Sequence, residues 1–324
     1  MIQRRVAATV VVGAILLVIG GLVRPRSAAT GIPQGQFWAT KLSLPARFDV
    51  VVAGCSRVYR AVSPAAMQEV LPGRRIVNFG FSGLAYGPEY LAAVERLLAP
   101  DSPRPVVVLS IQPVNFLESF SRKNGFTDER RRDVVSRWLA RHFGTAVQFL
   151  MPWGIDDSRQ SIRPSGVVYY EVYHPDGWVA SRKVPESPGE YLKSSAMVFA
   201  REQVSTRIEG ELFSTVGRWV AKGVVVIGVR LPTSPEMREL EDRASGFDES
   251  TFARRFAKEG GVYLSYPPGK YHSYDGSHLR ADSAVVFSRD LAQAIRPLVL
   301  RERRAEGPGR LPMPSGPSSA NVAS

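Results

Sequence analysis

The stretch from Phe48 to Arg57 constrains the fold most, because it joins a buried strand to a turn that carries a serine. Residues 50–54 are Val-Val-Val-Ala-Gly, a short continuous apolar run typical of a strand buried on both faces. Ser56 follows two residues later, where a chain leaving a parallel sheet turns into a helix. Open α/β folds place their ligands at this edge of the sheet. Ser56 is therefore a candidate nucleophile, although it could also simply cap the next helix.

Short apolar runs alternate with helical patterns along the rest of the chain. Strands are predicted at 75–79, 105–110, 223–229 and 262–264, and helices at 64–70, 88–98, 127–148, 195–222, 250–259 and 281–300. This alternation favours an α/β fold with a parallel sheet and right-handed crossovers. Residues 118–200 break the pattern. We expect an insertion there, packed over the sheet edge as a candidate lid or substrate wall.

The first 23 residues have the pattern of a membrane anchor. Residues 1–5 carry two arginines and are expected to form a cytoplasmic stub, whereas residues 6–23 are apolar and uncharged. About 18 such residues just span the hydrocarbon core as a helix. The small residues at 27–29 could serve as a cleavage site, but a cleavable signal has a shorter apolar run, so an uncleaved anchor is favoured. Residues 24–47 are predicted as a linker and 301–324 as a disordered tail.

Composition limits the partners of the remaining domain, residues 48–300. The chain of 324 residues has a net charge of +12, much of it in arginine clusters at 130–132 and 301–304. No aromatic-interleaved basic motif or zinc spacing accompanies these clusters, so no nucleic-acid partner is expected, and an anionic membrane or polymer fits as well. A single cysteine excludes an intrachain disulfide and a CxxC motif. We expect neither a metal nor another cofactor.

A second chemical cluster, residues 271–279, precedes the last predicted helix. Asp275 and His278 are three residues apart. In a turn, that spacing lets the carboxylate accept a hydrogen bond from the imidazole Nδ1–H, so that Nε2 faces a nucleophile. A serine hydroxyl needs such a base because it is a poor nucleophile at neutral pH. The same residues also fit an Asx turn with an exposed histidine, and His272 is a rival base.

Together, the two clusters resemble the SGNH (GDSL-type) hydrolase superfamily. Gly54-Cys55-Ser56 is similar to its first block, residues 78–83 (Asn-Phe-Gly-Phe-Ser-Gly) resemble its second block, and residues 274–279 (Tyr-Asp-Gly-Ser-His-Leu) match its last block, Asp-x-x-His. The resemblance covers about 48–116 and 220–298 and implies a flavodoxin-like three-layer α/β/α sandwich. With the N-terminal anchor, the chain most resembles membrane-tethered members associated with alginate O-acetylation and teichoic-acid D-alanylation.

This resemblance implies a role for each residue of the two clusters. Ser56 would be the nucleophile and His278 its base, with Asp275 holding the imidazole. The N–H groups of Ser56 and of a glycine in the second block would stabilise the oxyanion. Gly80 and Gly83 are the two candidates for that glycine, and Gly80 is favoured because it follows the strand directly.

The sequence departs from the family pattern in the first and third blocks. Cys55 replaces the usual aspartate and is a less favoured alternative nucleophile. Gln112 stands where the third block has asparagine, and its carboxamide could still donate to an oxyanion, with Asn115 as a second candidate. Losing one oxyanion donor costs roughly 10²–10³ in rate in known cases. Arg57 and Arg230, at strand ends, are candidates for binding an anionic substrate.

The sequence thus predicts a membrane-tethered serine esterase or O-acyltransferase whose domain is extracytoplasmic. Its substrate would be an acyl ester of a cell-surface glycan or a related ester, and a membrane-bound acyltransferase is a candidate partner. Either water or a sugar hydroxyl would take the acyl group, and the residues do not separate these outcomes. The alternative is a non-catalytic binding or assembly module of the same fold.

Overall fold

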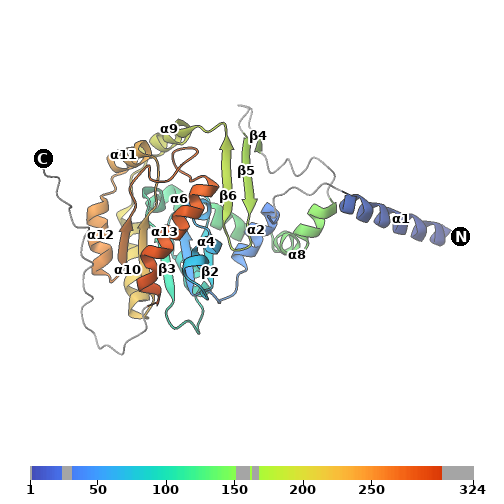
Figure 1. Cartoon of the computed structure of the whole chain (residues 1–324), viewed down its shortest axis with the longest axis horizontal. Coiled ribbons are helices and arrows are strands. Elements are labelled where there is room, and N and C mark those ends of the chain that lie inside the picture. Colours follow the sequence, from blue (N-terminus) through green and yellow to red (C-terminus); the bar gives the residue numbers. More distant parts are fainter. Residues whose placement is uncertain (1, 24–30, 151–160, 163–167, 301–324) are drawn as a thin grey trace.

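A parallel sheet of five strands forms the centre of the protein (Figure 1). The computed structural model describes residues 2–23, 31–150, 161–162 and 168–300, so the predicted tail 301–324 lies outside the described residues. The strands, in the spatial order β2-β1-β3-β7-β8, are β2 (Ile76–Gly80), β1 (Val50–Gly54), β3 (Val106–Ser110), β7 (Val225–Arg230) and β8 (Val262–Ser265). Counted along the chain this order is 2-1-3-4-5, the flavodoxin-like arrangement, and its switch point lies between β1 and β3.

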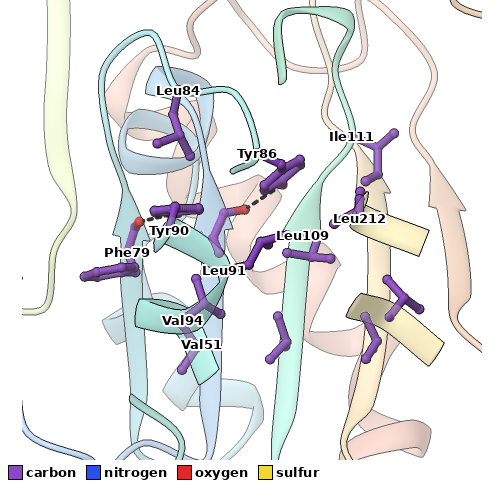
Figure 2. Packing of buried hydrophobic residues seen from close by; sticks show 14 of the residues in the cluster. Val51, Phe79, Leu84, Tyr86, Tyr90, Leu91, Val94, Leu109, Ile111 and Leu212 are labelled. Carbon is purple, nitrogen blue, oxygen red and sulfur yellow. Dashed lines mark hydrogen bonds between the residues drawn. The ribbon is translucent and has the colours of Figure 1, made fainter. Parts of the chain in front are cut away.

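Alternate side chains of the strands point to opposite faces of the sheet and form two apolar cores. Val51, Phe79 and Leu109 pack against α5 (Pro88–Leu97), α10 (Thr206–Ala221) and α12 (Glu249–Lys258). Figure 2 shows Leu91 and Val94 of α5 on this face of the sheet. Val50, Val52 and Val108 pack on the other side against α3 (Ser56–Ala61), α4 (Pro64–Val70) and α13 (Ala281–Leu300). The predicted α/β class and three-layer sandwich are therefore confirmed.

Two helices predicted as continuous are each divided. The predicted helix 127–148 consists of α7 (Gly125–Arg131) and α8 (Val134–Leu150). The predicted helix 195–222 is wrong in the same way, because α9 (Pro188–Phe199) ends before α10 begins. Ser205 caps α10 by accepting a hydrogen bond from the Ile208 N–H, and this cap starts a new helix. The remaining elements between strands are the 3₁₀ turn η1 (Pro113–Phe116), α6 (Glu118–Arg122) and α11 (Pro235–Ala244).

A small antiparallel sheet lies against the edge of the large one. It contains β4 (Ser161–Ile162), β5 (Val168–Tyr173) and β6 (Val179–Val184). The turn between β5 and β6 meets β2, where the Asn78 N–H donates to Asp176 O at 2.9 Å. Lys41 Nζ donates to Gly80 O at 2.7 Å and to Gly177 O at 2.9 Å. This part of the predicted insertion 118–200 thus covers the edge of β2, while the domain boundaries stay a prediction.

The N-terminal residues form helix α1 (Ile2–Val23), which includes most of the predicted stub as well as the predicted span 6–23. Among the residues that the structure describes, no helix is both long enough and apolar enough to cross a membrane. The side chains of residues 20–23 lie outside that set, and the predicted anchor is not confirmed.

The prediction of an irregular linker at 24–47 is wrong for part of that segment. Residues 24–30 lie outside the described residues, but α2 (Gln34–Leu42) is a regular helix that follows Pro33. Phe37 and Lys41 of α2 are buried, and Phe37 contacts Tyr173 of the small sheet edge to face. Tertiary packing therefore overrides the local effect of proline and glycine.

Candidate active site

Ser56 stands at the carboxyl end of β1, where the chain makes a tight turn into α3. The turn requires Gly54, which has φ +150°, because a Cβ there would lie 2.7 Å from Cβ of Ser110. Cys55 occupies the N-cap position of α3, so Ser56 is the first residue of the helix and not its cap. The cap interpretation of Ser56 is therefore wrong, and its hydroxyl is free to contact another part of the chain.

Three side chains at this edge of the sheet form a continuous chain of hydrogen bonds. Ser56 Oγ lies 2.8 Å from His278 Nε2, and His278 Nδ1 lies 2.8 Å from Asp275 Oδ2. The second oxygen of Asp275 accepts from the backbone N–H of Ser277 at 2.9 Å and of His278 at 2.7 Å. With Nδ1 donating to the carboxylate, Nε2 is the acceptor for the Ser56 hydroxyl. The structure thus brings together the three residues predicted as a triad, in the predicted order.

Burial and neighbouring charges shift the pKa values of His278 and Asp275. His278 is 5% exposed. Burial lowers its pKa below 6.5; the Asp275 carboxylate opposes this shift and the charges of Arg60 and Arg57 add to it. Burial alone would raise the pKa of Asp275, but the charge and hydrogen bonds of His278 and the Ser277 N–H outweigh it and lower that pKa to about 2. At neutral pH the pair is therefore a neutral imidazole beside an ionised carboxylate, as a general base requires.

The structure places the two glycines of the second block differently from the expectation. The Gly80 N–H already donates to Asn78 Oδ1 at 3.0 Å, and a Cβ at Gly80 would lie 2.8 Å from the backbone N of Tyr59. Gly80 is therefore enclosed behind α3 and is not available as predicted. Gly83 instead lines the cavity that contains Ser56 and has φ +56°. Its N–H and that of Ser56 make no hydrogen bond to any other described residue.

Gln112 and Asn115, the two candidates from the third block, have different surroundings. Asn115 is fully committed, because its Oδ1 accepts from Ser110 and from the Gln112 N–H while its Nδ2 donates to Leu84 O. Gln112 Oε1 accepts from Arg57 Nη1 at 2.6 Å, which leaves Nε2 buried with no hydrogen-bond partner among the described residues. A buried donor with no acceptor destabilises the folded protein, so the free Nε2 of Gln112 calls for an explanation.

Arg57 and Arg230, the candidate anion-binding residues, lie in a buried ion network. Arg57 Nη2 contacts Glu241 Oε1 at 2.6 Å, and Arg230 Nη2 contacts Glu241 Oε2 at 2.8 Å. Arg57 Nε also donates to Ser277 Oγ at 2.9 Å. Burial alone would lower the pKa of Arg57, but Glu241 raises it overall. Both arginines are thus neutralised by protein carboxylates, and Arg57 links the Ser56 turn to Gln112 and to the turn that carries His278.

The two alternative assignments lie in unsuitable surroundings. Cys55 is 2% exposed and burial raises its pKa, so its thiol stays protonated and unreactive at neutral pH. His272 is exposed and lies 2.7 Å from Glu186, with no contact to Ser56. Among the described residues, no group of three or more histidine, cysteine or acidic side chains could hold a metal ion.

A cavity of about 210 Å³ opens beside Ser56. The described residues that line it are Cys55, Ser56, Arg57, Gly83, Val114, Phe120, Tyr191, Ser194, Ser195, Val198, Phe199, Glu241 and Ser277. Helix α9, from the predicted insertion, forms one wall, and its Tyr191 packs edge-to-face on His278 with ring centroids 4.9 Å apart. Sequence reasoning missed Tyr191 and Glu241, because only folding brings α9 and α11 to the end of β1.

Comparisons with known proteins give distant likenesses. No family model and no curated protein matches the sequence. Among solved structures, the chain is similar to a protein from Agrobacterium tumefaciens described as an arylesterase, at 14% identity and TM-score 0.33, covering 76% of this chain and 98% of that one. A family two carbohydrate esterase from Clostridium thermocellum, an active-site mutant in complex with an oligosaccharide, is similar at 8% identity and TM-score 0.33, covering 78% and 64%. These scores are too low for either likeness to say what this chain does.

Proposed function

We propose that this protein is a serine ester hydrolase of the SGNH type, with Ser56 as nucleophile, His278 as general base and Asp275 as the group that orients it. The observation that carries the proposal is the continuous chain of hydrogen bonds from Ser56 Oγ through His278 to Asp275, beside a cavity that Ser56 lines. A buried carboxylate, a neutral imidazole and an accessible hydroxyl in this order are the parts that acyl transfer needs.

In the first half-reaction Ser56 Oγ attacks the ester carbonyl while His278 Nε2 takes the hydroxyl proton. The C–O bond to the leaving alcohol then breaks, and His278 returns its proton to that alcohol, which leaves the acyl group on Ser56. The negative oxygen of the tetrahedral intermediate lies against the N–H groups of Ser56 and Gly83, with Gln112 Nε2 as a third donor. Their lack of other partners among the described residues supports this assignment.

In the second half-reaction His278 takes a proton from an acceptor that attacks the acyl carbon. The bond from that carbon to Ser56 Oγ then breaks, and His278 returns the proton to Ser56. Water as the acceptor gives hydrolysis and a sugar hydroxyl gives O-acyl transfer, and both use the same groups. The proposed natural substrate is an acyl ester of a cell-surface glycan, with a membrane-bound acyltransferase as a candidate partner.

A membrane location with an extracytoplasmic domain also remains part of the proposal. Nine apolar side chains, spread over all sides of α1, are each at least 48% exposed, so the described chain leaves a large apolar surface of α1 uncovered. Helix α8 contacts α1 and exposes Val134, Trp138 and Phe143 beside arginines, a composition suited to an anionic membrane surface. Sedimentation with phosphatidylglycerol vesicles tests this location, and full-length protein that stays in the supernatant would contradict it.

The activity is tested with p-nitrophenyl acetate on the full chain. The Ser56→Ala and His278→Ala proteins should each lose at least about 10³-fold in kcat/KM while keeping the circular dichroism and melting temperature of the parent. Cys55→Ser is the matched control and should remain active. Turnover that survives in Ser56→Ala, or a parent protein with no turnover of any ester, would favour a binding module instead.

A further inference from the structure

Much of the wall of the cavity beside Ser56 is apolar, and this apolar part comes from three separate elements. Val114 belongs to η1, Phe120 to α6, and Val198 and Phe199 to α9. The only charged side chains among the described lining residues are Arg57 and Glu241, and they pair with each other at 2.6 Å. An ionised group inside the cavity would therefore lose its hydration without gaining a free counter-charge.

The lining residues bear on which part of an ester the cavity would hold. Gly83, whose N–H is the proposed second oxyanion donor, lines it, whereas His278 is absent from the described lining residues. The leaving alcohol must be within reach of His278 Nε2 to receive its proton, so it lies outside this wall. The acyl group stays on Ser56 through both half-reactions and suits an enclosed space, whereas the alcohol must exchange with the acceptor.

The volume of the cavity limits the acyl group. An engineered apolar cavity of about 150 Å³ holds benzene, which has six carbons. By the same ratio, the 210 Å³ beside Ser56 holds at most about eight carbons, and a less tightly filled chain has about six. An acetyl group would leave most of this apolar wall unoccupied.

We infer that the cavity is the acyl-binding site and that it selects an uncharged acyl chain of about six to eight carbons. This inference rests on the proposed esterase function and names its substrate class. It predicts that acetyl is not the best acyl group. It also predicts that aminoacyl and dicarboxylic acyl groups react poorly, because they would bring a charge into the cavity.

The first test is a series of p-nitrophenyl esters from acetate to dodecanoate, measured as kcat/KM on the full chain. Each added methylene should raise kcat/KM about three- to fourfold up to six to eight carbons, because each buried CH₂ contributes that factor. The rate should fall for longer chains. The mono-adipate ester, which matches hexanoate in length but ends in a carboxylate, should react at least about tenfold more slowly than hexanoate.

The second test alters the cavity itself. Val198→Phe narrows the cavity and should move the optimum to four carbons or fewer. Met197→Phe is the matched control, since Met197 is on the same helix, is 58% exposed and does not line the cavity. Its chain-length profile should equal that of the parent.

Four results would overturn the inference. An optimum at acetate, or a chain-length profile that Val198→Phe leaves unchanged, would show that the cavity is not the acyl-binding site. The esterase proposal would still stand. A rate that rises with the length of the alcohol at constant acyl group assigns the cavity to the alcohol instead. A protein that turns over no ester at all ends both this inference and the proposed function.

Discussion

Asp275 and His278 hold each other in position within a single turn. The turn depends on Gly276, which has φ +86° and whose Cβ would lie 2.7 Å from Pro188 O. Because Asp275 accepts three hydrogen bonds within this turn, from the Ser277 N–H and from the backbone and imidazole of His278, the imidazole has one orientation and one tautomer. The spacing Asp-x-x-His is therefore a local device that presents Nε2 to Ser56.

The pKa of His278 predicts the acid limb of the pH profile. Its folded pKa is lowered by burial, so activity should rise with pH through a midpoint below 6.5 and then level off. Asp275→Asn should move the midpoint lower still, because the carboxylate raises that pKa, and should reduce kcat by about 10³–10⁴-fold. The measurement is kcat/KM from pH 4.5 to 8. His272→Ala is the control, and a midpoint above 6.5, or one that His272→Ala moves, would contradict the assignment.

The carboxamide of Gln112 offers a second prediction at this scale. Gln112→Glu keeps an oxygen for Arg57 Nη1 and removes the two Nε2 hydrogens, so the fold should persist. The turnover number should fall by about 10²–10³ or more with little change in KM, because only the oxyanion loses a donor. Gln68→Glu, at an exposed position on α4, is the matched control. Equal kcat values for the parent and Gln112→Glu would remove Gln112 from the oxyanion site.

At the scale of elements, the β5–β6 turn fixes the small sheet to the edge of the large one. Gly177 in that turn has φ +93°, and a Cβ there would lie 1.9 Å from Asn78 O of β2. β5 is also tied to α3, the helix of Ser56, through the ion pair of Arg60 with Glu171. Edge strands with unpaired backbone groups need such a cover.

Gly177→Ala should therefore destabilise the protein by about 2–3 kcal/mol, because the backbone conformation is strained for alanine and β2 would have to move. Gly210→Ala is the matched control, and its expected change in the free energy of unfolding has the opposite sign. Gly210 lies within α10 with nothing within 4 Å of an added Cβ, so alanine should stabilise by about 0.5–1 kcal/mol. Urea unfolding measures both, and a Gly177→Ala protein as stable as the parent would show that this turn does not hold the sheets together.

For the whole molecule, the site depends on the strand order. Ser56 and His278 are 222 residues apart, and they meet because the chain returns to the switch point beside β1. The strands could be predicted from sequence because runs such as Val50–Gly54 are apolar throughout, as strands buried on both faces require. The triad could be predicted because each half has a local signature at a turn.

Other parts of the site could not be predicted, because their surroundings come from distant segments. The sequence favours Gly80 over Gly83 because Gly80 follows the strand directly, and only the packing of α3 on β2 shows that Gly80 is enclosed. Arg57 looks like a free cation until folding brings Glu241 to it across 184 positions. The helix α2 within the predicted linker follows from burial of Phe37, which no local pattern indicates.

The most direct test of the central claim is covalent labelling of Ser56 in the full-length protein. A fluorophosphonate should add to the parent once, as seen by intact mass, and peptide mapping should place the adduct on Ser56, since only an activated serine attacks phosphorus at a useful rate. Ser56→Ala should take up none, and His278→Ala should react at least about 10³-fold more slowly. A parent protein that takes up no label, or a Ser56→Ala protein labelled at the parental rate, would contradict the assignment of Ser56 and His278 as nucleophile and base.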